Sequence, residues 1–293
     1  MSDGSYLERL GRRTGATGSV LCLGLDPDPA EIPAVFGHGL PAAERFARLV
    51  LDAAGPAAAA VKANLAFFEA FGSAGLAALE RLRAAMPDDL PFIADAKRGD
   101  IDSTAARQAV ALFDGLAADA ITVNPYLGGE AIRPLLERSG RFAYILCRTS
   151  NPGAGELQDL VVAEDAVTAV PAEPLWARVA RRAAAWDLGG TVGLVVGATV
   201  GDELAATRDI APGLAFLVPG VGAQGGPLEP VLRHGRATSP PAGGRPGGGL
   251  LVNVSRAIAR ALADEPASGD KGTPEERLAT AAHAWSTRLA VLP

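Results

Sequence analysis

The chain has 293 residues, of which 48% are apolar, and its formal net charge is −6. This length can bury a large core, and the acidic balance argues against a surface built to bind nucleic acid or anionic lipid. After the polar segment 1–18, no continuous apolar run is long enough for a signal peptide or a membrane span. We therefore expect a cytoplasmic protein with no nucleic-acid or membrane partner.

Cysteine and histidine are too sparse for a disulfide framework or a transition-metal site. Cys22 and Cys147 each lie inside an apolar run, which favours buried, reduced thiols. His38, His234 and His283 are scattered without the spacing of metal ligands. The sequence therefore predicts no metal ligand set built from these residues.

Short apolar runs recur along the chain, each about the length of a strand that is buried on both faces. They cover residues 19–25, 59–63, 91–96, 120–124, 142–148, 191–197, 215–219 and 250–254. Between them the apolar period becomes helical, which predicts helices that cover the strands. The apolar stripes are Phe46, Leu49, Val50 and Ala53; Ala106, Val110, Phe113 and Ala117; and Trp176, Val179, Ala183 and Trp186.

A C-terminal helix is predicted over residues 273–291. Thr273 and Glu276 have the spacing of a capping box, with Pro274 at the first helical position. The apolar residues that follow share one face of this helix: Leu278, Ala282, Trp285 and Leu289.

Eight strands that alternate with helices predict an α/β fold, and specifically a (β/α)8 TIM barrel in a single domain over residues 1–293. Segment 1–18 is then an N-terminal lead-in, and 151–171 and 236–249 are long loops. We expect the second loop to be mobile because it is rich in Gly and Pro. An open doubly wound sheet is the less favoured alternative, since the turn after the first strand, residues 24–29, has prolines in place of backbone donors.

Polar residues follow the predicted strands, at the end of a barrel where catalytic groups lie. Taken singly, each can be a turn or capping residue. Their convergence on one end of the barrel instead favours a site. These residues are Asp26, Lys62, Asn64, Asp95, Lys97, Asn124 and Ser150.

The segment Asp95-Ala96-Lys97-Arg98-Gly99-Asp100 is the most informative part of the chain. Side chains on a strand alternate between faces, so Asp95 and Lys97 point the same way and place opposite charges in one site. An isolated pair of this kind can also be a solvated ion pair at a strand end. Asp100 lies beyond the strand, so its partner can lie elsewhere.

The loops after the seventh and eighth strands predict a phosphate site. The first, residues 219–226, is rich in glycine, and the second places Ser255 and Arg256 before a helix. Barrels often bind phosphate at these two loops, through backbone amides at a helix start. The alternative is that the glycines only form a turn and Arg256 lies on the surface.

Taken in order along the chain, these motifs resemble orotidine 5'-phosphate decarboxylase, and specifically its bacterial type 2 branch. The resemblance covers nearly the whole barrel and diverges mainly in the two long connections and the C-terminal helix. It rests on LCLGLDP (21–27), KAN (62–64) with FFE (67–69), DAKRGDI (95–101) with Thr104, VNPY (123–126), TSNPG (149–153), PGVGAQGG (219–226) and NVSRAI (253–258).

The resemblance implies a cofactor-free and metal-free decarboxylation of orotidine 5'-phosphate to uridine 5'-phosphate and carbon dioxide in pyrimidine biosynthesis. It makes Lys97 the proton donor to C6 of the pyrimidine ring. It also implies a homodimer with shared active sites, in which Asp100 and Thr104 reach into the site of the second subunit. The full set of implied catalytic residues is Lys62, Asp95, Lys97 and Asp100, and that of substrate-binding residues is Asp26, Thr104, Asn124, Ser150, Gln224 and Arg256.

Two other functions stay open at this point. A barrel that resembles hexulose-phosphate synthase would hold Mg²⁺ between a carboxylate on strand two and Asp95, but strand two presents Lys62 instead. A nucleotide-binding barrel without activity would keep the fold alone. Schiff-base chemistry is disfavoured, because Asp95 stabilises the charged form of Lys97.

Overall fold

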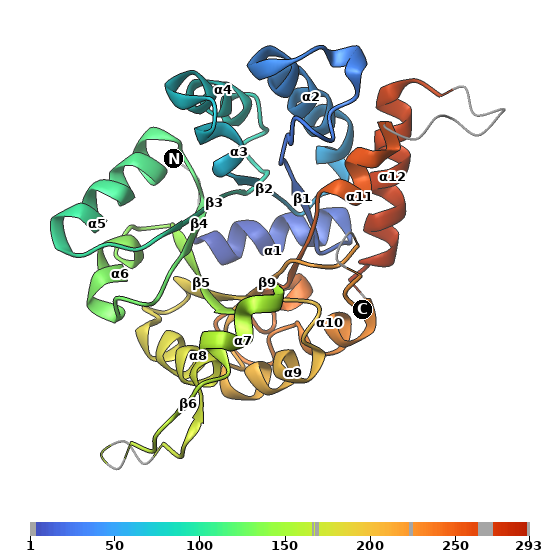
Figure 1. The fold of residues 1–293 in the computed structure, drawn as a ribbon. Helices are drawn as coiled ribbons and strands as arrows, with labels where there is room; N and C mark the ends of the chain where they lie inside the picture. The colour runs from blue at the N-terminus through green and yellow to red at the C-terminus, as the bar shows by residue number, and fades with distance from the viewer. Residues whose placement is uncertain (1–3, 166, 168–169, 223–224, 263–271, 292–293) are drawn as a thin grey trace.

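The computed structural model describes residues 4–165, 167, 170–222, 225–262 and 272–291, and its centre is a closed parallel barrel (Figure 1). The strand order around the barrel is β1-β10-β9-β8-β5-β4-β3-β2. The predicted (β/α)8 barrel is therefore confirmed. Its strands are β1 (Leu21–Gly24), β2 (Ala60–Asn64), β3 (Phe92–Arg98), β4 (Ala120–Val123), β5 (Phe142–Arg148), β8 (Val192–Val196), β9 (Ala215–Val218) and β10 (Leu251–Val254).

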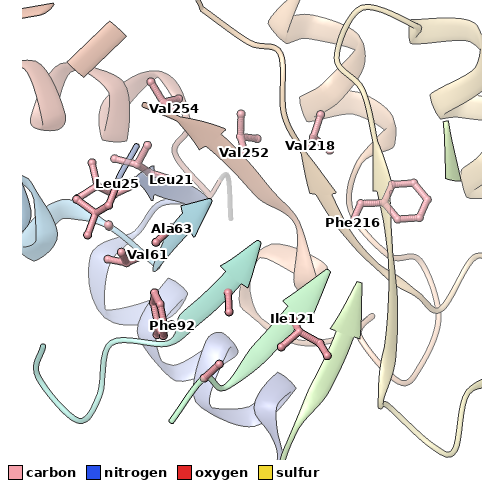
Figure 2. Close-up of a cluster of buried hydrophobic side chains, with 14 of the residues drawn as sticks. Leu21, Leu25, Val61, Ala63, Phe92, Ile121, Phe216, Val218, Val252 and Val254 are labelled. Atoms are coloured by element: carbon pink, nitrogen blue, oxygen red, sulfur yellow. The ribbon is translucent and has the colours of Figure 1, made fainter. Parts of the chain in front are cut away.

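The strands are buried on both faces because helices cover the outside of the barrel and side chains fill its inside. Outward-facing residues such as Leu21, Val61 and Phe92 form one cluster of fully buried side chains (Figure 2). Their neighbours along the strands, such as Cys22 and Ile93, belong to a second cluster inside the barrel. This alternation leaves the inward positions at the carboxyl ends of the strands for polar residues.

Helices follow the strands around the barrel. The apolar face of α12 is buried as predicted, and its Thr273–Glu276 capping box is present. The longer helices are α2 (Gly39–Ala54), α4 (Gly72–Ala84), α5 (Asp102–Ala109) with its π-helical continuation η3 (Val110–Gly115), α6 (Gly129–Leu136), α8 (Leu175–Trp186), α9 (Gly201–Ile210), α10 (Leu228–His234) and α12 (Pro274–Arg288). Short helical turns are α3 (Ala66–Glu69), α7 (Gly155–Gln158), α11 (Arg256–Ala259), η1 (Ala34–Phe36), η2 (Gly55–Ala57), η4 (Pro152–Ala154), η5 (Pro246–Gly249) and η6 (Arg260–Leu262).

The apolar stripe predicted for α5 and η3 is confirmed at Phe113 and wrong by one position at Ala106, Val110 and Ala117. Val110 is exposed and Ala106 only half-buried, whereas Ala105, Ala109 and Leu112 are buried. Two alanine-rich stripes one residue apart have the same helical period. Only the packing of the helix against the barrel decides between them.

The N-terminal lead-in contains a helix, α1 (Tyr6–Thr17), that closes the amino end of the barrel. The Tyr6 hydroxyl lies 3.1 Å from that of Tyr144, and the Tyr6 ring stacks on Phe142 inside the barrel. Arg9 pairs with buried Asp119 at 2.9 Å. We did not predict α1, although Ser5 begins a capping box with Glu8. The barrel therefore opens at its other end, where the strands finish.

Both long connections contain structure that the sequence analysis did not predict. Segment 151–171 includes η4, α7 and β6 (Val161–Val162), which pairs antiparallel with β7 (Glu173–Pro174) in a hairpin that projects from the barrel (Figure 1). Segment 236–249 is packed against α1 rather than free, and its glycines at 247–249 are buried. A Cβ on Gly247 would lie 2.7 Å from the Thr14 side chain, so this contact needs glycine. The expectation of a mobile loop there is not supported.

Candidate active site

A cavity of about 500 Å³ opens at the carboxyl end of the barrel. Its walls come from the ends of the strands and the loops after them, which is where barrel enzymes carry their catalytic groups. Charged and polar groups surround it, and apolar side chains of β5, β8 and β9 form one wall. The lining residues include Asp26, Asp28, Lys62, Asn64, Phe67, Asp95, Lys97, Thr122, Leu146, Ser150, Val195, Leu217, Asn253, Ser255 and Arg256.

The Asp95 carboxylate is the centre of the charged array. Its Oδ2 accepts a hydrogen bond from Lys62 Nζ at 2.7 Å. Its Oδ1 accepts one from Lys97 Nζ at 2.6 Å and another from Thr122 Oγ1 at 2.8 Å. Asp95 and Lys62 are buried, whereas the Lys97 side chain is 48% exposed. The array therefore holds one ammonium inside the wall and presents the other to the cavity.

Strand order and register bring these residues together. β2 and β3 are neighbours, and Asn64 pairs with Asp95 in their register, so Lys62 and Asp95 both project into the barrel on adjacent strands. Asp26, in the loop after β1, accepts a hydrogen bond from the Asn64 amide at 3.1 Å. This contact holds a second carboxylate beside the buried ammonium of Lys62.

The array keeps Asp95 and Lys62 ionised although both are buried. Burial alone would raise the pKa of Asp95, but Lys62 and Lys97 outweigh burial and hold that pKa below its usual value. Burial alone would lower the pKa of Lys62, but Asp26 and Asp95 raise it above its usual value. The site therefore carries fixed opposite charges over the physiological pH range.

The structure brings most of the predicted site residues to this cavity. Asp26, Lys62, Asp95, Lys97, Ser150 and Arg256 all line it. Gln224, predicted to bind phosphate, lies outside the described residues.

Three predicted residues do not line the cavity within the described subunit. Asn124 is exposed, and its Oδ1 accepts a hydrogen bond from the Tyr126 amide, so it stabilises the turn after β4. Asp100 accepts a hydrogen bond from the Ile101 amide in its own loop, and Thr104 is exposed on α5. The structure thus gives Asn124 a role in the turn and leaves Asp100 and Thr104 outside the cavity of their own subunit.

Other residues of the cavity wall were not predicted from the sequence. Thr122 occupies an inward position of β4 and donates to Asp95, and Asn253 occupies an inward position of β10. Phe67 enters from the short helix α3, and Asp28 from the loop after β1. Strand alternation could have placed Thr122, since it lies two residues after inward-facing Ala120. A threonine in an apolar strand is too common to attract notice by itself.

Comparison with known proteins shows which family this chain belongs to. The model of the orotidine 5'-phosphate decarboxylase / HUMPS family matches residues 19–269. The chain belongs to this family. An orotidine 5'-phosphate decarboxylase of Thermomicrobium roseum is 45% identical over 257 residues, which are 87% of this chain and 86% of that protein. One of Halorubrum lacusprofundi is 44% identical over 92% of both chains.

Solved structures agree with the barrel. The structure of Leishmania donovani OMP decarboxylase superposes with a TM-score of 0.79 at 35% identity and covers 98% of this chain and 97% of its own. The resemblance found from the motifs is therefore confirmed. Among the described residues, no helix combines the length and the apolar character needed to cross a bilayer.

Proposed function

We propose that this chain is an orotidine 5'-phosphate decarboxylase that uses no cofactor or metal and acts in pyrimidine biosynthesis. Membership of the family and the names of the relatives support the carboxy-lyase activity. The observation that carries the mechanism is the Asp95 carboxylate held between the ammonium groups of Lys62 and Lys97 at the cavity wall. This array matches the charge changes of decarboxylation.

Lys97 supplies the proton in this proposal. When the bond between C6 and the carboxylate breaks, carbon dioxide leaves and the electron pair stays on C6 of the ring. No neighbouring carbonyl delocalises this pair well, so a nearby ammonium must stabilise it. Lys97 then transfers a proton from Nζ to C6, giving uridine 5'-phosphate, and the neutral amine is reprotonated from solvent.

Asp95 holds the ammonium of Lys97 and opposes the substrate carboxylate. Two like charges about 4 Å apart repel by about 4 kcal/mol at an effective dielectric near 20, and this repulsion ends when carbon dioxide leaves. The larger contribution is the preorganised position of Lys97, because its charge needs no rearrangement as C6 becomes anionic. We assign ribose contacts to Asp26 and Lys62 and the pyrimidine edge to Ser150.

Phosphate binds at Arg256 in this proposal. This guanidinium is exposed at the start of α11, lines the cavity, and forms no salt bridge within the described ranges. Gly220 and Val221 line the cavity beside it. Gln224 is proposed as a further phosphate ligand on the family resemblance alone.

Replacing Arg256 with alanine should lower kcat/KM for orotidine 5'-phosphate by about 10- to 150-fold, since a charge-assisted contact contributes ~1.5–3 kcal/mol. Steady-state kinetics measure this loss. Arg260→Ala is the matched control, because Arg260 lies one turn later and pairs with Glu31 at 3.1 Å instead of lining the cavity. An equal loss in both variants would contradict the assignment.

Lys62 separates this proposal from the magnesium-dependent alternative within the family. A divalent cation at Asp95 would need a second carboxylate on β2, but the Lys62 ammonium lies there, 2.7 Å from Asp95 Oδ2. A cation in that place would be repelled by Lys62, and β2 would offer it no carboxylate ligand. The residues therefore do not fit this metal site.

The deciding experiment is turnover of orotidine 5'-phosphate in excess chelator, followed by the ultraviolet change as orotate becomes uracil. Sustained turnover is the expected result. A requirement for Mg²⁺ would favour the synthase-like alternative. Binding of uridine 5'-phosphate without turnover would instead establish an inactive nucleotide-binding barrel. A cytoplasmic location without nucleic-acid partners stays a prediction.

We also propose a homodimer in which Asp100 and Thr104 complete the site of the partner subunit. Neither residue lines the cavity of its own subunit, yet both belong to the motif that begins with Asp95. Ile101 lies beside them with 51% of its surface exposed. An exposed apolar side chain next to unused polar ones suits an interface better than a solvated loop.

Subunit exchange tests this shared site. Lys97→Ala and Asp100→Ala should each be inactive alone, but a heterodimer of the two would contain one site without either change. Equal mixing should then restore about a quarter of the wild-type activity, because half of the dimers carry one intact site of two. Native mass spectrometry verifies exchange. No recovery after verified exchange would refute the shared site.

A further inference from the structure

The pairing of β3 with β4 is interrupted at the active site. Ala94 pairs with Ile121 and Arg98 pairs with Val123, so Asp95, Ala96 and Lys97 all face Thr122 alone. Extra residues on one strand form a bulge, which redirects side chains and leaves a backbone group without its ladder partner. Lys97 has φ +46°, in the left-handed region that a lysine seldom adopts. The bulge therefore holds the backbone of Lys97 in this strained conformation beside the cavity.

The Thr122 hydroxyl replaces the missing ladder partner. It accepts a hydrogen bond from the Lys97 backbone amide at 2.9 Å and lies 2.8 Å from Asp95 Oδ1. Since an amide can only donate and an ionised carboxylate can only accept, the hydroxyl proton must point at Asp95. One side chain therefore holds both the backbone of Lys97 and the carboxylate that binds its ammonium.

Burial makes this hydroxyl hard to replace. Thr122 is 1% exposed, and Asp95 is also buried. If the hydroxyl is removed, the Lys97 amide loses its partner in a strained conformation, and Asp95 Oδ1 keeps only the half-exposed Lys97 ammonium. The unpaired amide then favours a different path for the backbone around Lys97.

We propose that Thr122 is a positioning residue for the decarboxylation, which sets the place of the Lys97 ammonium through the Lys97 backbone and through Asp95. This inference rests on the proposed function, in which Lys97 protonates C6. Thr122 itself transfers no proton to substrate. Its loss should therefore affect the chemical step more than the binding of the nucleotide.

The test compares Thr122→Val, which keeps the shape and removes the hydroxyl, with Thr122→Ser, which keeps the hydroxyl. Thr122→Val should lower kcat about 10- to 100-fold with KM changed by less than about threefold. The reason is that the Lys97 ammonium would move from its preorganised position, while the contacts that bind the nucleotide would remain. Thr122→Ser should stay within about fivefold of wild type, because a serine hydroxyl can make both hydrogen bonds. Thr122→Ala takes the place of the valine variant if that one fails to fold.

Thr207→Val is the matched control. Thr207 is fully buried, and its hydroxyl donates to the Glu203 carbonyl at 2.6 Å within α9, outside the cavity wall. It measures the cost of removing a buried hydroxyl away from the site. A kcat for Thr122→Val within threefold of wild type, or a serine variant as impaired as the valine variant, would overturn the proposal.

Crystal structures keep this test separate from the proposed function. If wild type fails to decarboxylate orotidine 5'-phosphate, the proposed function fails, and the structures of wild type and Thr122→Val still decide the positioning role. Displacement of the Lys97 backbone from φ +46° and of Nζ from its 2.6 Å contact with Asp95 supports it. An unchanged Lys97 in the valine variant overturns it.

Discussion

Replacement of Lys97 with alanine should lower kcat for orotidine 5'-phosphate by about 10⁴-fold. The variant loses a general acid, which contributes about 10²–10⁴-fold, and a preorganised charge beside the developing carbanion, which contributes about 10²–10³-fold. The two effects overlap because one ammonium provides both. Single-turnover kinetics with excess enzyme measure the residual rate without interference from product release.

Thermal stability and the binding of uridine 5'-phosphate distinguish this catalytic loss from misfolding of the variant. The Lys97 side chain is half-exposed and contributes little to the core, so the variant should keep its thermal midpoint and should bind uridine 5'-phosphate within about tenfold of wild type. Arg48→Ala serves as the control, because Arg48 is a cation in an exposed ion pair with Asp52 on α2, far from the cavity wall. Residual turnover within about 100-fold of wild type would remove Lys97 from the role of proton donor.

The barrel was predictable because its signal is periodic and repeated. Each apolar run has the length of a buried strand, and the closed order of these runs follows from their alternation with helices. Helix α1 was not predicted because it is polar overall and its large buried apolar side chains are only Tyr6, Leu7 and Leu10, which is too few for a clear apolar stripe. The projecting hairpin β6–β7 has strands of two residues, which is too short for a period-two pattern.

Within the site, the sequence predicts features that depend on neighbouring residues but not contacts that depend on how distant strands pair. Strand alternation placed Asp95 and Lys97 on one face, because that rule needs only neighbouring residues. The contact of Lys62 with Asp95 depends on the register of β2 against β3, and the role of Thr122 depends on a bulge between β3 and β4. No local sequence pattern encodes either pairing. Asp100 and Thr104 were named from the family motif, and a single subunit gives them no place in the site.

Replacement of Asp95 with asparagine should abolish activity and also destabilise the fold. The change leaves the Lys62 ammonium, whose side chain is 6% exposed, without its partner at 2.7 Å. Removing one member of a buried ion pair costs about 3–5 kcal/mol, because the remaining charge stays buried and loses its hydrogen-bonded counter-charge. The Asp26 carboxylate beside Lys62 compensates only part of this loss. Urea denaturation at pH 7 measures the free energy of unfolding. Asp52→Asn is the matched control, because Asp52 pairs with Arg48 at the same 2.7 Å but is 52% exposed.

The destabilisation by Asp95→Asn should depend on pH, because Asp95 limits it at low pH and Lys62 limits it at high pH. The folded pKa of Asp95 is lowered, since Lys62 and Lys97 outweigh burial, so its contribution is present above about pH 4 and is lost as the pH falls through the folded value. The folded pKa of Lys62 is raised, so its contribution is present below about pH 10 and is lost as the pH rises through its folded value. The difference in unfolding free energy between wild type and Asp95→Asn should therefore be largest between about pH 4 and pH 10. Asp52→Asn should change stability by less than about 1 kcal/mol over that range, and an equally small effect of Asp95→Asn would mean that the buried pair does not stabilise the fold.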